Sequence, residues 1–190
     1  MNMRRFFNPG LFLIAFMLLG CAPVATQELD ENVWAAKERA SNEAYREDQR
    51  IETVAVDHIY GQFKILIHVN VTSFNRRVLI SGEVPDESTR SAIEKIVTGI
   101  AGVRHVNNEL VISENSSLGS RSSDSMITSK IKLQLARDSR TGNDRIRVVS
   151  ENGTVFLMGN VKHVEAAAAA EIASTTGGVR LVVKLFDYAD

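Results

Sequence analysis

Val155-Phe156-Leu157-Met158-Gly159-Asn160-Val161 decides the fold of this 190-residue chain, because a second version of it, Val78-Leu79-Ile80-Ser81-Gly82-Glu83-Val84, stands earlier in the sequence. A second pair of matching dipeptides, Gly102-Val103 and Gly178-Val179, is separated by almost the same number of residues. The interval of about 77 residues exceeds the length of a solenoid repeat. The chain is therefore predicted to contain two copies of a small domain, each with its own core.

The second copy shows the element order most clearly. Apolar residues recur every fourth position from Ile127 to Leu135, which predicts a helix that starts at Asp124 as its N-cap. Asn152-Gly153 supplies the positive φ angles of a tight hairpin between two alternating strands. A helix over about 164–175 and a strand over 179–186 complete the order αββαβ.

The first copy follows the same order, from an opening helix at residues 51–59 to a last strand over 103–112. Arg76 stands where the second copy has Gly153, so we expect the first hairpin turn to be built differently. Each copy is predicted to be an α+β sandwich, a small sheet with two helices on one face. The predicted core residues are Ile51, Ala55, Val71, Ile80, Ile93, Ile96, Ile127, Ile131, Leu135, Val148, Leu157 and Ile172.

Composition divides the mature chain into four parts. Residues 48–112 and 124–190 are the two predicted domains, and each is close to the lower size limit for a self-sufficient core. The two cores therefore either share an interface or stand apart. Residues 113–123 hold six serines and a glycine, which predicts a flexible linker that lets the domains move. Residues 21–47 are predicted to be a charged tether or a solvated helix.

The amino terminus predicts export. Residues 1–20 combine two arginines with an apolar run from Leu11 to Leu19, which is the pattern of a signal peptide. Leu18-Leu19-Gly20-Cys21 resembles the lipobox of bacterial lipoproteins, which implies that diacylglycerol and an N-acyl chain such as palmitate are attached to Cys21. Ala22 follows, and by resemblance to enterobacterial lipoproteins the absence of an aspartate there points to the outer membrane.

Charge and side-chain chemistry exclude several function classes. Two of the 22 basic residues lie in residues 1–20, so 20 remain against 23 acidic ones, and nucleic acid is not an expected partner. Cys21 is the only cysteine, which excludes an intramolecular disulfide. The four histidines lie far apart without metal-ligand spacing, at His58, His68, His105 and His163. We therefore expect no metal, no other cofactor and no enzyme activity.

The stretch from Glu151 to Gly159, with its counterpart around Gly82 and the two Gly-Val steps, resembles the BON domain over about residues 48–190. A lipoprotein signal before two such domains resembles the family of division- and outer-membrane-stress-associated lipid-binding lipoproteins of Gram-negative bacteria. The resemblance implies a non-enzymatic protein on the inner leaflet of the outer membrane, facing the periplasm. It also implies binding of anionic phospholipid and a role in envelope integrity, cell division and the stress response.

The outer faces of the two opening helices differ. In the second copy, Met126 and Leu133 share the outer face, and the basic residues around them are Lys130, Lys132 and Arg137. This helix carries two more basic than acidic residues, whereas the opening helix of the first copy carries two more acidic than basic ones. Apolar side chains ringed by cations suit the headgroup boundary of an anionic membrane. These five residues are therefore the predicted phospholipid site.

Two alternatives stand beside this prediction. Met126 and Leu133 would instead pack against the first domain or the linker, and the lysines would serve only solubility. In the second alternative, the domains bind a protein partner in the envelope, and the chain is an anchored adaptor. The sequence itself specifies neither the phospholipid nor the oligomeric state.

Overall fold

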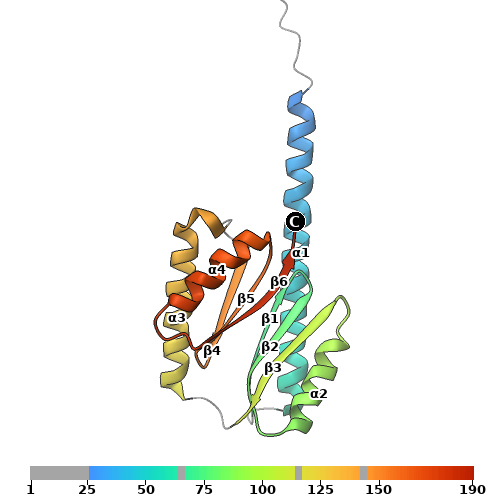
Figure 1. Ribbon diagram of the computed structural model, residues 1–190. Helices are drawn as coiled ribbons and strands as arrows, with labels where there is room; N and C mark the ends of the chain where they lie inside the picture. Colours follow the sequence, from blue (N-terminus) through green and yellow to red (C-terminus); the bar gives the residue numbers. More distant parts are fainter. Residues whose placement is uncertain (1–25, 64–66, 114–116, 142–144) are drawn as a thin grey trace, which may run out of the picture. The chain divides into compact units, whose positions relative to one another are not determined.

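The computed structural model describes residues 26–63, 67–113, 117–141 and 145–190 (Figure 1). The predicted signal peptide and the predicted lipid anchor at Cys21 lie outside these residues. Residues 38–190 form one compact unit that contains both copies of the repeat. Among the described helices, none combines the length and the apolar composition that crossing a bilayer requires.

The first copy folds into a three-stranded sheet covered on one face by helices. β1 (His68–Phe74) runs antiparallel to β2 (Arg77–Val84), which runs parallel to β3 (His105–Ile112). The covering helices are α1 (Thr26–Phe63) and α2 (Glu87–Thr98). Side chains from both helices and from the sheet form one buried core, which includes Ile51, Ile59, Ile80, Ile93 and Val97.

The second copy repeats this arrangement. β4 (Ile146–Glu151) runs antiparallel to β5 (Thr154–Val161), which runs parallel to β6 (Leu181–Tyr188). The helices are α3 (Leu118–Arg137) and α4 (His163–Thr175), and a 3-10 turn, η1 (Ser139–Thr141), follows α3. Their core includes Ile131, Leu135, Val148, Leu157 and Ile172. The predicted α+β class and the αββαβ order of both copies are confirmed.

The predicted core residues are buried with two exceptions. Val71 and Ile96 are half-buried, and both pack against the core of the first copy. The repeated glycines explain part of the sequence match, because a side chain at either would collide with the neighbouring strand. A Cβ atom at Gly82 would meet the carbonyl of His68, and one at Gly159 would meet the carbonyl of Arg145. The glycine is needed wherever β2 or β5 passes its antiparallel partner this closely.

The two hairpin turns are alike, which corrects the expectation drawn from Arg76. The φ angles are 50° and 65° at Asn75 and Arg76, and 47° and 72° at Asn152 and Gly153. Arg76 therefore adopts the left-handed conformation that glycine adopts in the second copy, at a steric cost. The carboxylate of Asp48 offsets this cost, because it accepts the backbone N–H groups of Asn75 and Arg76 at 2.7 and 2.8 Å.

Asp124 accepts the corresponding hydrogen bonds in the second copy. The prediction that it is the N-cap of the opening helix is wrong. α3 begins earlier, at Leu118, and is capped by Ser117, whose hydroxyl accepts the N–H of Ser120 at 3.2 Å. Much of the serine-rich segment predicted as a flexible linker is therefore helical. Asp124 lies inside α3, where its buried carboxylate accepts the N–H groups of the turn between β4 and β5. Serine at helix N-termini misled the prediction, because it favours caps as well as linkers.

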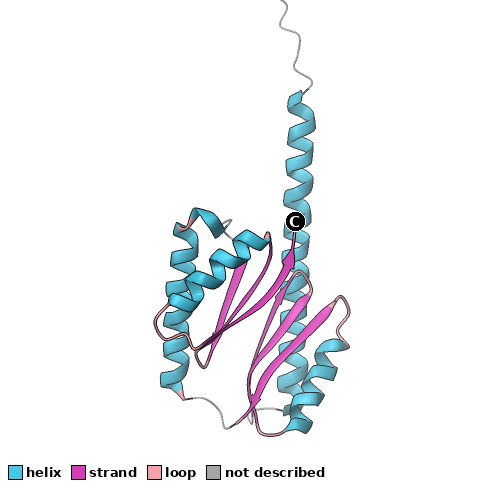
Figure 2. Ribbon diagram, in the orientation of Figure 1, coloured by secondary structure: helices cyan, strands magenta, loops and turns pink. Residues whose placement is uncertain are grey.

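The two sheets share an interface through the faces that their helices leave open (Figure 2). Alternate residues of β2 and β5 serve different cores: Ile80 and Leu157 face the helices, whereas Leu79 and Phe156 face the other sheet. The shared cluster contains Leu79, Phe156, Met158 and Leu185, with Phe74, Val149 and Val183 packed against it. The two small cores thus join into a larger one. These contacts do not favour the independent domain movement that was expected from a flexible linker.

Polar contacts across the interface surround this apolar cluster. Arg77 forms an ion pair with Asp187 at 2.7 Å. Arg147 lies 3.4 Å from the carboxylate of Glu52 and donates to the carbonyl of Ser73. Because these contacts are partly buried, salt screens them less than it screens exposed ion pairs.

Candidate functional site

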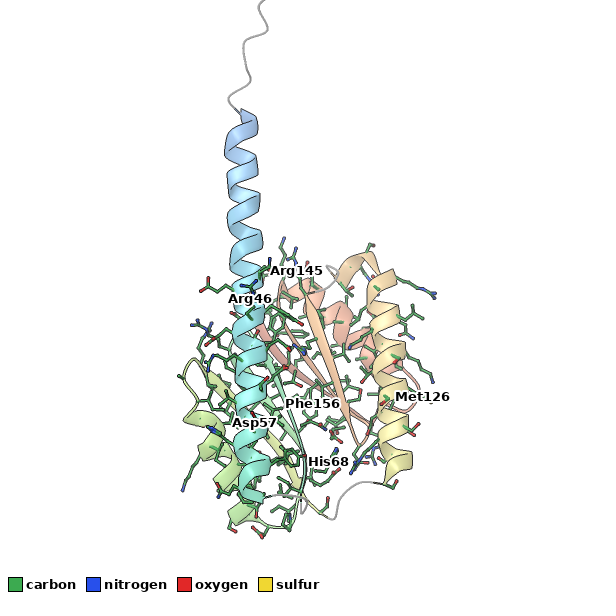
Figure 3. All side chains as sticks on the ribbon, turned by 180° about the vertical axis from the view of Figure 1, so that it is seen from behind. Arg46, Asp57, His68, Met126, Arg145 and Phe156 are labelled. Carbon is green, nitrogen blue, oxygen red and sulfur yellow. The ribbon has the colours of Figure 1, made fainter. Side chains whose placement is uncertain are left out.

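α3 places its predicted site residues on the side opposite the core. Ile127, Ile131 and Leu135 are buried in the second core, as their spacing of four residues predicts. Met126 and Leu133 are 57% and 52% exposed, and Figure 3 labels Met126 on α3. The alternative in which these two side chains pack against the first domain or the linker is therefore not what the structure shows.

The cations of this surface have no acidic partner among the described residues. Lys130, Lys132 and Arg137 are all exposed, and no ion pair joins them to a described carboxylate. The nearest acid in sequence is Asp138, which forms an ion pair with Arg140 at 2.7 Å. Hydrogen bonds from Arg140 hold the pKa of Asp138 below its usual range. The five predicted residues, Met126, Lys130, Lys132, Leu133 and Arg137, are named the α3 surface below.

The corresponding surface of α1 has a different character. Arg50 stands where Met126 does in α3, but its guanidinium pairs with Glu47 at 2.9 Å and donates to the carbonyl of Ala101. Val54 is half-buried against the first core, and Asp57 is exposed. α1 therefore offers no exposed apolar side chain ringed by unpaired cations at these positions. The two copies share a fold and differ in this surface.

A second polar cluster lies between the two sheets, and it was not predicted from the sequence. The imidazole Nδ1 of His68 lies 2.7 Å from Oε2 of Glu83 and 3.8 Å from Oε1 of Glu151. The side-chain amide of Asn70 donates to Oε2 of Glu151 at 2.9 Å. Burial raises the pKa of Glu151, and the nearby carboxylates of Glu83 and Asp124 raise it further, whereas Asn70 and His68 oppose the shift.

Part of this cluster carries a sequence signal. His68 and Glu83 are direct partners in the β1–β2 register, so a hairpin centred on Asn75-Arg76 places them opposite each other. Glu151 comes from the other domain, 81 residues from Asn70, and no local pattern announces that contact. The histidines looked dispersed because the groups that meet His68 belong to different strands.

Comparison with known proteins gives the chain its relatives. The BON domain family matches residues 50–114 and 123–190. The chain is 41% identical over 130 residues to the outer membrane lipoprotein DolP of Haemophilus influenzae, covering 68% of this chain and 67% of that protein. It is 35% identical over 128 residues to the 21 kDa hemolysin of Actinobacillus pleuropneumoniae, covering 67% of this chain and 66% of that protein. The solved C-terminal domain of CdsD, a structural protein of the type III secretion system of Chlamydia trachomatis, is 15% identical with a TM-score of 0.28, covering 70% of this chain and 62% of that one.

Proposed function

Since this chain belongs to the BON-domain family and is an outer-membrane lipoprotein of the DolP type, we propose that it binds anionic phospholipid through its second domain. Through this contact it supports the integrity of the outer membrane from the periplasmic side. Two attachments serve this role, a covalent one at Cys21 and a reversible one at the α3 surface. The role is non-catalytic, because the α3 surface offers apolar and cationic groups but no imidazole, thiol or carboxylate to act on a bound lipid.

The observation that carries the proposal is the α3 surface itself. Met126 and Leu133 expose apolar side chains on the same side of one helix, beside Lys130 and Arg137. Burying such side chains at the headgroup boundary gains about 25 cal/mol for each Å² removed from water, and each nearby cation adds about 1 kcal/mol on an anionic surface. The two effects add because the same helix presents both. The binding is therefore shallow, charge-dependent and selective for anionic lipid.

The acyl anchor makes a weak surface contact sufficient. Diacylglycerol and an N-acyl chain on Cys21 hold the chain at the membrane, since each buried methylene contributes about 0.8 kcal/mol. A domain tethered in this way meets the membrane at a high effective concentration, so its own affinity need not be high. The second contact then sets how the domain is presented to the lipid rather than whether the protein stays attached.

Liposome flotation of an unlipidated chain tests the proposal. Residues 21–190 with Cys21→Ser are mixed with neutral liposomes or with liposomes that contain anionic phospholipid, and we expect flotation only with the anionic ones. Leu133→Asp places a carboxylate on the α3 surface and is expected to abolish flotation. We expect this variant to keep its fold, because position 133 lies off the core stripe. Val164→Asp is the matched control, since Val164 is also an exposed apolar residue but lies on α4, outside the α3 surface.

The competing role is the anchored protein-binding adaptor, and the same experiment separates it. A folded wild-type chain that floats with neither kind of liposome leaves the adaptor as the function. Flotation that Leu133→Asp leaves unchanged removes the α3 surface from the mechanism. Circular dichroism of each variant shows whether the fold is retained.

A further inference from the structure

Side chains cover the outer edge of β3, the last strand of the first copy. β3 pairs with β2 on one side only, and backbone groups of Asn108 and Leu110 point to the other side. The guanidinium of Arg90, on α2, donates to the carbonyl of Asn108 at 3.2 Å, and the amide oxygen of the Asn108 side chain accepts the N–H of Leu110 at 3.3 Å. The same side chain donates to the carboxylate of Glu94 at 2.9 Å. Edge strands that are covered in this way are less open to pairing with another chain.

The second copy has no such side chains at these positions. The N-caps Asp86 and Lys162 align α2 with α4, and the parallel ladders align β3 with β6. In this alignment, the counterparts of Arg90, Glu94 and Asn108 are Ala166, Ala170 and Lys184. An alanine side chain forms no hydrogen bonds, so these two positions of α4 do not cover the outer edge of β6.

β6 therefore presents an unpaired backbone edge (Figure 1). The N–H groups of Leu181 and Ala189 point inward, to the carbonyls of Gly153 and Val161. Alternate residues of a strand direct their backbone groups to opposite sides, so the outward groups of β6 belong to Val182, Lys184, Phe186 and Tyr188. Within the described part of the chain, no hydrogen bond reaches these outward groups. A row of backbone donors and acceptors is matched best by another extended chain, which favours a polypeptide as the partner.

The side chains along this edge indicate the chemistry of that polypeptide. Lys184 is exposed in the middle of β6 and forms no ion pair with a described carboxylate, because Asp187 of the same strand pairs with Arg77. Leu181 and Tyr188 expose apolar surface at the two ends of β6. Cross-strand pairs of opposite charge and pairs of apolar side chains both stabilise a sheet. A strand with a central carboxylate between apolar residues therefore fits this edge.

A second copy of this chain fits the edge less well. Antiparallel pairing of two β6 strands places both Lys184 side chains on the same face of the joined sheet, since residues opposite each other share a face. Like charges at such positions repel, and lysine on an edge strand is a common protection against self-association. Lys184 thus disfavours a second copy and favours a partner of opposite charge.

We propose that the outer edge of β6 binds an extended acidic segment of a protein partner, which adds a strand to the sheet of β4, β5 and β6. Backbone hydrogen bonds supply the affinity, and the ion pair with Lys184 selects the acidic segment. No residue of this edge belongs to the α3 surface. Docking of the partner is therefore a function beyond lipid binding and does not depend on it.

Hydrogen exchange with a defined peptide tests the strand addition. Residues 21–190 with Cys21→Ser are mixed with millimolar amounts of the capped peptide Thr-Val-Thr-Glu-Thr-Val-Thr, and amide exchange is recorded by NMR. We expect the peptide to slow exchange at the outward amides of β6 and to leave the amides of β3 unchanged. N-methylation of the glutamate and both valines removes the N–H groups that face β6 and should abolish binding. N-methylation of the two central threonines alters the other side of the peptide and should leave binding intact.

Charge exchange tests the role of Lys184. Replacing the glutamate of the peptide by lysine is expected to weaken binding about fivefold. Lys184→Glu should reverse this preference and keep the fold, because the side chain is exposed. Lys95→Glu makes the same change at an exposed position of α2 and should retain the preference for the glutamate peptide. Circular dichroism shows that both variants are folded.

Three results of these experiments would overturn the proposal. The glutamate peptide would slow exchange at none of the outward β6 amides, or the peptide methylated on the β6 side would bind as well as the parent, or Lys184→Glu would still prefer glutamate. A fourth result has the same force. A wild-type chain that sediments as a dimer, with these amides protected before any peptide is added, places a second copy on the edge instead.

Discussion

The carboxylate of Asp124, in the middle of α3, accepts the backbone N–H of Gly153 in the β4–β5 turn at 2.8 Å, although the two residues are 29 positions apart. Asp48 does the same for Arg76 in the first copy. One acidic side chain on each opening helix therefore ties that helix to a hairpin turn. The repeat preserves this link even where the turn residue itself has changed from glycine to arginine.

Removing either aspartate is expected to destabilise its domain. Asp124→Ala leaves two backbone N–H groups of a partly buried turn without their acceptor, which we expect to lower the free energy of unfolding by about 2 kcal/mol or more. Asp48→Ala should cost at least as much, because Arg76 then holds its positive φ without support. Urea unfolding measures both effects. Asp57→Ala, at an exposed position of α1, is the control and should change stability little.

The interface between the sheets predicts cooperative unfolding. Phe156 is buried between the sheets (Figure 3), and truncating such a side chain costs about 3–5 kcal/mol. We expect Phe156→Ala to weaken the contact between the domains and to split one thermal transition into two, as seen by calorimetry. Val164→Ala, on the exposed side of α4, should retain a single transition. Two transitions in the wild type would contradict the shared core.

Salt and charge reversal test the electrostatic part of lipid binding. The Debye length falls from about 10 Å at 0.1 M salt to about 3 Å at 1 M, so flotation with anionic liposomes should weaken but not vanish as salt rises. Lys130→Glu reverses one cation of the α3 surface and should weaken binding severalfold. Lys184→Glu makes the same change on β6, outside that surface, and should bind as the wild type does. Equal losses in both variants would point to net charge rather than to α3.

The anchor prediction is tested in cells. Cys21→Ala removes the only thiol of the chain, so we expect the protein to leave the outer-membrane fraction or to accumulate as precursor. Fractionation followed by immunoblotting distinguishes these results from normal localisation. A variant that still fractionates with the outer membrane would show that attachment does not depend on this cysteine.

The contact between His163 and Asp190 predicts a titration at acidic pH. The hydrogen bond between Nδ1 of His163 and Asp190 is the main reason that the pKa of Asp190 lies below its usual range. Since the folded pKa is lowered, the stabilisation is present above the ordinary aspartate pKa of about 3.9 and is lost as the pH falls through the folded value. Carbon NMR of the Asp190 carboxyl group measures this pKa. His163→Ala should raise it, whereas His105→Ala should not.

Local patterns in the sequence determined the architecture of each copy. These patterns concern residues that are near in sequence or adjacent in one hairpin. They are the four-residue spacing from Ile127 to Leu135, the Asn152-Gly153 turn, and the repeated Gly82 and Gly159. Helix and strand periodicity report such relationships directly. The same periodicity placed Met126 and Leu133 on the outer side of α3, where the structure exposes them.

Only the tertiary structure decided what the second face of each sheet contacts. The apolar runs of β2 and β5 are buried on both sides, yet a run without alternation does not say which surface covers it. The hydrogen bonds from Asn152 to Asp124 and from Asn70 to Glu151 likewise join residues that are 28 and 81 positions apart. A contact between separate elements leaves no periodic signal in either one, because it is fixed by how two finished surfaces pack together.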